Sequence, residues 1–268
     1  YAYEKKQYNK AIYTGELFAK DLCLVNGDTE MSGAPDTSTY KAAALFDVNN
    51  SKTTYAYNAT SKMYPASTTK IVTALVALKY GNLNDEVTIS YNATHINEYG
   101  AKLCGFAEGD KITLKKLLYS FLICSGNDAG IAIAEHIAGS VDKFAAMMNK
   151  EVKALGCSGS NFVNASLYIV SITSKGHNAP LYTLAEVLKY DVFMDIINHS
   201  SYKAEFNGAD GNKKTLWFTS TDKYLLGSAK APEGVTVIGG KTGTTSMAGS
   251  NLILYSKNSN GNSYISVV

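Results

Sequence analysis

Three short segments of the chain contain the side chains of a serine acyl-transfer site. They are Ser67–Lys70, Ser125–Asn127 and Lys241–Gly243, and they occur in that order along 268 residues. Together they supply two serine hydroxyls, two lysine amines and one amide, which can activate a serine nucleophile without histidine or a metal ion. If the three segments meet in the folded chain, we expect an acyl-enzyme. If they do not, each is an ordinary surface segment.

The pattern Ser-x-x-Lys is weak by itself because it occurs five times. The pairs are Ser38/Lys41, Ser67/Lys70, Ser140/Lys143, Ser200/Lys203 and Ser220/Lys223. Only Ser67 begins a segment that is apolar on almost every side, residues 71–78, so it is predicted to start a buried helix. One helical turn places Lys70 on the same face as Ser67. Burial lowers the pKa of a lysine, which makes Lys70 a candidate base.

The pattern Ser-x-Asn is weaker still, with two further matches elsewhere in the chain. Ser125–Asn127 follows the apolar run 117–124 and precedes another helical pattern. One interpretation is a turn between helices in which Asn127 or Asp128 caps the second helix. The functional interpretation is a polar loop that points into a cleft.

Lys241–Gly243 occurs once and is the sharpest of the three patterns. It follows a strand-like run and lies among Gly239, Gly240 and Gly243. Glycines in a strand permit the close approach of another backbone, and an extended peptide could pair with such an edge. The alternative is a bulged, glycine-rich strand with surface threonines.

Hydrophobic periodicity predicts strands at both ends of the chain and helices between them. A hairpin is expected over 41–59 and strands over 214–218, 235–238, 251–255 and 264–268. Helices are expected over 11–25, 67–80, 114–123, 129–137, 141–155 and 181–197. The hairpin and three or four of the late strands could form one antiparallel sheet with the helices inserted between them. We therefore predict a discontinuous sheet subdomain, 1–80 with 203–268, and a helical subdomain, 81–202.

Composition excludes several classes of function. The chain has 25 basic residues, all lysine, and 23 acidic residues, and its net charge of +2 without a basic stripe argues against nucleic acid as a partner. No apolar run approaches the ~18 residues of a membrane span, and the first residues lack a signal-peptide pattern. The last strand pattern stops abruptly, which suggests a truncated C-terminus. Without arginine, an anionic substrate must be held by lysine, hydroxyl, amide or backbone groups.

Cysteine and histidine spacing predicts no metal site and no cofactor. Cys23, Cys104, Cys124 and Cys157 form no C-x-x-C pair, and the four histidines form no H-x-x-x-H pair. Cys124 lies in an apolar run and is predicted to be a buried thiol. The sequence leaves the pairing of the cysteines open.

The order of the three segments, with their flanks, resembles the low-molecular-mass D-alanyl-D-alanine carboxypeptidases of the penicillin-recognising serine enzymes. The matching flanks are 65–70, 125–129 and 240–245, and the resemblance runs from about Lys41 to the end. It implies an α+β fold of three-layer α/β/α type. A five-stranded antiparallel sheet would be flanked by helices, with an inserted all-helical subdomain. It also implies a bacterial, extracytoplasmic enzyme that would reach the membrane only through a C-terminal anchor absent from this chain.

The resemblance implies a role for each residue. Ser67 would attack the peptide bond between two D-alanines of a peptidoglycan stem peptide, and Lys70, influenced by Lys241, would accept its proton. Ser125 would relay a proton to the leaving amine, and Asn127 would hold the acyl-side amide and Lys70. The remaining assignments are substrate contacts at Thr242, Gly243, Thr244 and Lys241, and an oxyanion hole from the backbone N–H groups of Ser67 and Thr244. A β-lactam antibiotic would acylate Ser67 covalently.

Two departures and two alternatives accompany this resemblance. The arginine that relatives often use for the substrate carboxylate is absent, and the region 164–180 differs from the family pattern. A serine β-lactamase has the same motifs, but class A versions need a glutamate where 158–180 has no acidic residue. A non-catalytic β-lactam-binding sensor would keep the acylation of Ser67 without peptide turnover.

Overall fold

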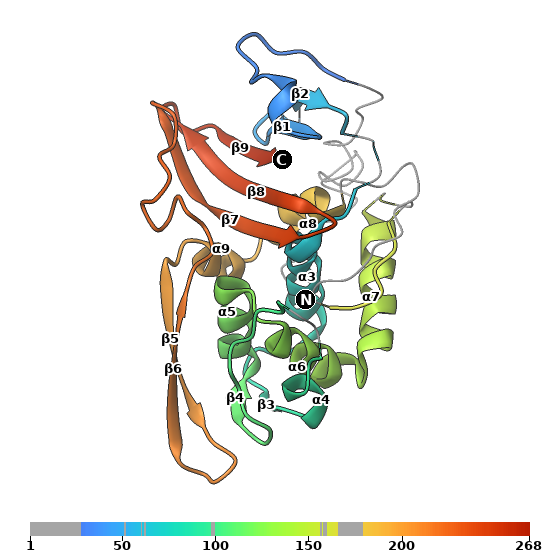
Figure 1. Ribbon diagram of the computed structural model, residues 1–268, viewed down its shortest axis with the longest axis vertical. Helices are drawn as coiled ribbons and strands as arrows, with labels where there is room; N and C mark the ends of the chain where they lie inside the picture. The colour runs from blue at the N-terminus through green and yellow to red at the C-terminus, as the bar shows by residue number, and fades with distance from the viewer. Residues whose placement is uncertain are drawn as a thin grey trace, which may run out of the picture.

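The computed structural model describes residues 28–50, 52–59, 61, 63–97, 100–155, 157, 160–165 and 179–268, with only the backbone of 179–182. The predicted helix over 11–25 lies outside these residues. Two antiparallel sheets and a group of helices form the described part, and Figure 1 shows the larger sheet above the helices. This arrangement confirms the predicted α+β class.

The larger sheet has five antiparallel strands, as predicted, and their order is β2-β1-β9-β8-β7. Its strands are β1 (Ala43–Asp47), β2 (Lys52–Tyr57), β7 (Val235–Thr245), β8 (Gly249–Asn258) and β9 (Ser263–Val267). The two ends of the described chain meet here, because β9 pairs with β1. β7, which contains Lys241, is an edge strand of this sheet.

The central helix lies behind this sheet and begins at the first motif. A 3-10 turn, η2 (Ala66–Thr69), leads directly into α3 (Lys70–Tyr80), and every side chain from Ile71 to Ala77 is buried. The other helical elements are η1 (Thr37–Thr39), α4 (Tyr91–Thr94), α5 (Leu114–Cys124), α6 (Asn127–Ala138), α7 (Val141–Ala154), α8 (Ala179–Val187) and α9 (Asp191–Ile197). The single helix predicted over 181–197 is therefore wrong, since residues 188–190 separate α8 from α9.

The second sheet corrects the expectation of an all-helical insertion. Its order is β3-β4-β5-β6, with β3 (Glu86–Thr88), β4 (Lys111–Thr113), β5 (Ser201–Asn207) and β6 (Lys213–Thr219). Three-residue strands such as β3 and β4 are too short to show an alternating pattern. β5 and β6 form a long hairpin beside α5 instead of joining the larger sheet (Figure 1). One face of this hairpin is buried, at Ala204, Phe206 and Phe218, and the other is exposed.

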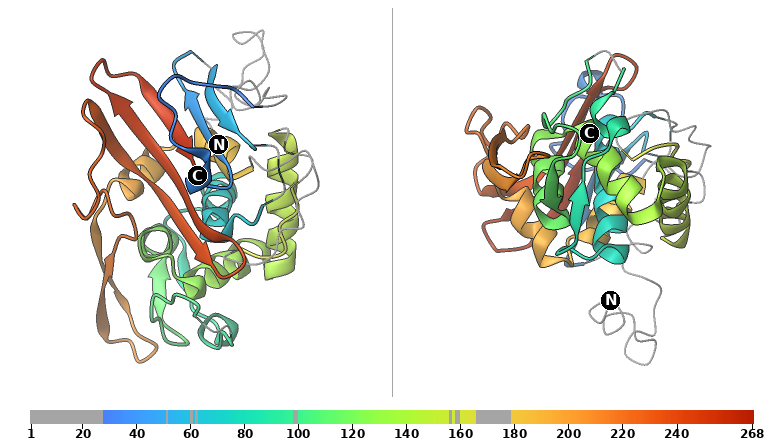
Figure 2. Two further views of the ribbon diagram at one scale, coloured as in Figure 1. Left: turned by 45° about the horizontal axis from the view of Figure 1, so that its top comes forward. Right: turned by 90° about the horizontal axis from the view of Figure 1, so that it is seen from below.

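The helices bring distant segments of sequence to one end of the larger sheet. η2 contacts β7 and β8, while α3 contacts α5, α6, α7 and α8. Figure 2 shows the same grouping from two further directions, with α3 among the other helices. Within the described residues, a second helical layer on the opposite face of the sheet is not present, so the three-layer arrangement stays a prediction. The division into two subdomains also stays a prediction.

Candidate active site

The first motif forms a tight, buried turn. Ser67 is in η2, directly before α3, and the preceding Ala66 has a φ of +49°, a left-handed conformation that L-residues rarely adopt. Ser67 is 7% exposed and Lys70 is fully buried. The Nζ of Lys70 lies 3.0 Å from the Oγ of Ser67. The turn thus holds an amine beside a hydroxyl, the first requirement for a serine nucleophile.

The second motif holds the same lysine from the opposite side. Asn127 is the first residue of α6, and its Oδ1 accepts a hydrogen bond of 2.8 Å from Nζ of Lys70. The centre of the Phe121 ring in α5 lies 5.7 Å from this Nζ. The N–H of Asn127 donates to the carbonyl of Lys102 at 2.7 Å, which fixes the start of α6. Lys70 is therefore positioned by two side chains from two separate elements.

Ser125 lies on the turn between α5 and α6. It is the C-cap of α5, is 4% exposed, and has a φ of +66° and a ψ of +33°. A left-handed serine ends α5 sharply and allows α6 to begin two residues later. The next residue, Gly126, has no room for a side chain, because a Cβ would lie 2.3 Å from the Sγ of Cys104. Ser125 and Asn127 are thus held on one short, buried turn.

Lys241 lies on the edge strand β7 and is 2% exposed. Its Nζ donates a hydrogen bond of 2.8 Å to the carbonyl of Thr242. Burial, and then the charge of Lys102, lower the pKa of Lys241 to about 7, although Cys124 and Asp222 act in the opposite direction. At neutral pH both the charged and the neutral forms of the Lys241 amine are therefore populated.

Gly243 brings the third motif against the first. A Cβ at this position would lie 2.8 Å from the backbone nitrogen of Ser67 and 3.0 Å from the carbonyl oxygen of Pro65. The close approach predicted from the glycines is therefore confirmed, and β7 runs directly beside the serine turn. The hydroxyl of Thr242 lies 2.5 Å from that of Thr221, and Thr244 is exposed.

Several residues of this site carried no sequence signal. Lys102 and Phe121 lie far from Lys70 along the chain and belong to no motif. Cys124, predicted to be buried, is partly exposed. Of the divergent region 164–180, residues 166–178 lie outside the described residues.

The described residues contain no cluster of histidine, cysteine and acidic side chains that could hold a metal ion. In that same part of the chain, no helix has the length and apolar character of a membrane span.

Comparison with known proteins agrees with this geometry. The model of the D-alanyl-D-alanine carboxypeptidase family, peptidase S11, matches residues 29–268. The carboxypeptidase DacF of Bacillus subtilis is 32% identical over 69% of this chain and 47% of its own length. DacA of Haemophilus influenzae is 29% identical over 98% of this chain and 65% of its own. The chain therefore spans about half to two thirds of the length of these relatives.

The fold comparison gives the same result. The crystal structure of the Streptomyces K15 DD-transpeptidase is 25% identical, with a TM-score of 0.75 over 84% of this chain and 87% of that one. A putative penicillin-binding protein homologue from Mycobacterium tuberculosis has the same identity and TM-score over 90% of this chain and 86% of its own. Since the family model covers nearly all of the described residues, the chain belongs to the D-alanyl-D-alanine carboxypeptidase family.

Proposed function

We propose that this chain is a serine D-alanyl-D-alanine carboxypeptidase that trims peptidoglycan stem peptides through an acyl-enzyme. The observation that carries this proposal is the buried position of Lys70, whose Nζ is 3.0 Å from Ser67 Oγ and 2.8 Å from Asn127 Oδ1. A base within hydrogen-bond distance of a hydroxyl, oriented by a third group, is the arrangement that nucleophilic catalysis needs. The membership of the family supports the substrate class.

The roles in the acylation step are those that the family resemblance implies, and the contacts of Lys70 with Ser67 and Asn127 support them. Ser67 Oγ attacks the carbonyl carbon of the last peptide bond, and its proton passes to Lys70 Nζ. The backbone N–H groups of Ser67 and Thr244 receive the developing oxyanion, which the close approach of β7 to η2 supports. When the C–N bond breaks, Ser125 passes its proton to the departing amine of D-alanine and takes in return the proton that Lys70 Nζ accepted from Ser67. Water then hydrolyses the ester and restores the serine.

Substrate binding uses the free side of β7. Since β7 is an edge strand, an extended peptide could add to it through main-chain hydrogen bonds. The terminal carboxylate would meet the hydroxyls of Thr242 and Thr244 and the amine of Lys241, with Gly243 allowing close contact. A β-lactam mimics this peptide end and acylates Ser67. Because the proposed substrate is peptidoglycan, we also propose that the enzyme acts outside the cytoplasm, in the bacterial cell envelope.

Release of D-alanine from a peptide ending in D-Ala-D-Ala tests the proposal, together with the mass of the protein after incubation with penicillin. We expect release by the wild type and one covalent adduct on the Ser67 peptide. Both should be lost in Ser67→Ala. The matched control is Ser38→Ala, which removes the serine of another Ser-x-x-Lys pair on an exposed turn and should keep both activities.

The same two measurements separate the alternatives. Rapid, repeated hydrolysis of penicillin without D-alanine release would identify a serine β-lactamase. A stable adduct on Ser67 without D-alanine release would identify a β-lactam sensor. The absence of any adduct on Ser67 would contradict the assignment of the nucleophile and thereby the whole proposal.

A further inference from the structure

Two cysteines from different elements meet beside the Ser125 turn. Cys104 lies in the segment before β4, and Cys124 is the last residue of α5, directly before Ser125. Their sulfur atoms are 3.1 Å apart, closer than two sulfurs that merely touch. A disulfide requires about 2.05 Å, so a shift of roughly 1 Å would bring the sulfurs to bonding distance.

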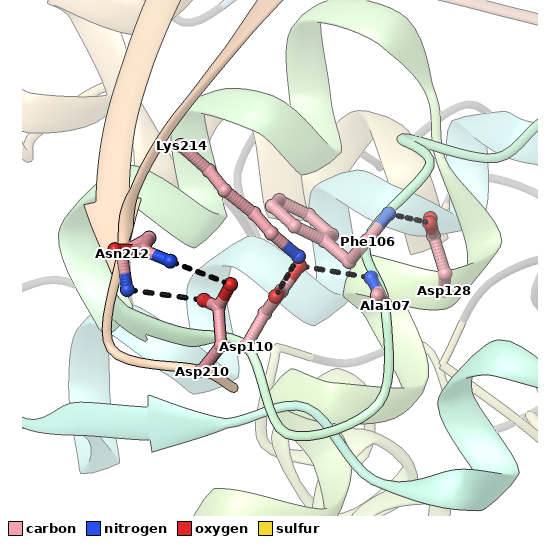
Figure 3. Close-up of polar contacts among 7 residues, drawn as sticks. All are labelled: Phe106, Ala107, Asp110, Asp128, Asp210, Asn212 and Lys214. Carbon is pink, nitrogen blue, oxygen red and sulfur yellow. Dashed lines mark hydrogen bonds and ion pairs between the residues drawn. The ribbon is translucent and has the colours of Figure 1, made fainter. Parts of the chain in front are cut away.

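The backbone around Cys104 is fixed by a buried carboxylate. Asp128, which is 2% exposed, accepts hydrogen bonds from the N–H groups of Cys104 at 2.8 Å, Gly105 at 2.8 Å and Phe106 at 3.4 Å. Figure 3 shows the last of these bonds. The sulfur of Cys104 also fills the space beside Gly126. The hydrogen bonds of Asp128 and the packing against Gly126 therefore hold the two thiols close together.

The two thiols differ in access and acidity. Cys124 is partly exposed, and the hydrogen bond from Cys104 is the main cause that lowers the pKa of its thiol. Cys104 is buried, and burial is the main cause that raises the pKa of its thiol. Because the thiolate is the nucleophile in disulfide exchange, Cys124 is suited to react first and Cys104 to resolve the product.

We propose that Cys104 and Cys124 form a disulfide that fastens the 100–110 segment to the end of α5. The oxidant is a disulfide, either a small molecule or an oxidised thiol–disulfide protein. The Cys124 thiolate attacks one sulfur of the oxidant, whose S–S bond breaks and releases one thiolate. The deprotonated Cys104 then attacks the sulfur of Cys124 and displaces the second thiolate. Two electrons and two protons thus pass from the protein to the oxidant.

The bridge would stabilise the turn that contains Ser125 and Asn127. It closes a loop of about 20 residues, which removes conformational freedom from the unfolded chain. Since both sulfurs already lie close together, little native geometry has to change. We therefore expect the oxidised protein to melt several degrees higher than the reduced protein and to keep its acylation by penicillin.

Incubation with oxidised glutathione, followed by alkylation and non-reducing peptide mapping, tests this assignment. The expected product is one peptide pair that joins Cys104 to Cys124. Cys104→Ala should stop at a glutathione adduct on Cys124, whereas Cys124→Ala should leave Cys104 unmodified. Cys157→Ala, at another buried thiol, is the matched control and should keep both the bridge and the rise in melting temperature.

Three results would overturn the proposal. The first is two alkylated, free thiols at Cys104 and Cys124 after oxidation of the folded protein. The second is a bridge from either residue to Cys23 or Cys157. The third is a bridged protein that melts no higher than the reduced one. Peptide mapping of the wild type alone already tests for the bridge, so the proposal can be tested even if a variant fails to fold.

Discussion

Folding strongly changes the ionisation of Lys241. Its pKa falls from 10.5 to about 7, chiefly through burial and then through Lys102. Below pH 7 the lysine is charged in both states, so the folded state bears the full cost of a buried charge. Between pH 7 and 10.5 the unfolded state binds more protons, and stability rises with pH. A neutral side chain at this position removes that dependence.

We therefore predict that Lys241→Met stabilises the fold below pH 7, by several kcal/mol, and that the gain shrinks toward pH 10. Loss of the hydrogen bond to the Thr242 carbonyl offsets part of this gain. Urea unfolding of the variant and the wild type at pH 6, 8 and 10 measures the difference in their free energies of unfolding. Lys257→Met, on the exposed face of β8, is the control and should show no such trend. A gain independent of pH would contradict the assigned pKa.

The site residues differ in how far local sequence predicts their contacts. The 3.0 Å contact between Ser67 and Lys70 follows from one turn of helix, so the sequence alone indicates it. The contact between Lys70 and Asn127 joins residues 57 positions apart. No local rule predicts that contact, and only the family resemblance suggested it. Lys102 acts on Lys241 from a segment without any motif, so it was missed.

At the scale of elements, the closeness of β7 to η2 decides whether the three motifs form one site. Gly243→Ala should slow acylation by penicillin strongly, because a Cβ 2.8 Å from the nitrogen of Ser67 forces the strand away from the serine turn. Stopped-flow or gel-based acylation with a fluorescent penicillin measures the rate. A loss of ~10²-fold corresponds to the weakening of one oxyanion-hole donor.

Thr236→Ala provides the control for this strand. It lies on β7, is exposed and is far along the strand from η2, so the acylation rate should stay near that of the wild type. Circular dichroism and the melting temperature check that Gly243→Ala is folded. A folded Gly243→Ala with an unchanged acylation rate would contradict the role of the close approach.

The elements themselves were predicted unevenly. Long segments with a clear period, such as α5 and α7, appear close to their predicted bounds, whereas β8 extends beyond the predicted 251–255 at both ends. The break between α8 and α9 was missed because both helices have apolar residues at compatible spacing. β6 was assigned to the wrong sheet, since alternation fixes which residues face inward but does not identify the neighbouring strand. Its partner β5 is adjacent in sequence, and only packing on α5 places the pair.

At the scale of the whole molecule, the second sheet fastens the segment that borders the site. Asp110, which is 1% exposed, accepts hydrogen bonds from Lys214 Nζ at 2.7 Å and from the N–H of Ala107 at 2.9 Å (Figure 3). Lys214 belongs to β6, so the hairpin β5–β6 is tied to the far end of the 100–110 segment. Asp128 ties the near end, as described above.

These two ties should contribute separately to stability and to activity. Asp110→Asn removes the ion pair with Lys214 and weakens the hydrogen bond from the N–H of Ala107. We therefore predict a melting temperature several degrees lower than that of the wild type. The rate of acylation by penicillin at 25 °C should stay close to wild type, because Asp128 still holds Cys104 and Phe106. Asp210→Asn, at an exposed turn of the same hairpin, is the control and should leave the melting temperature nearly unchanged. Slower acylation by Asp110→Asn at an unchanged melting temperature would mean that the hairpin positions the site itself.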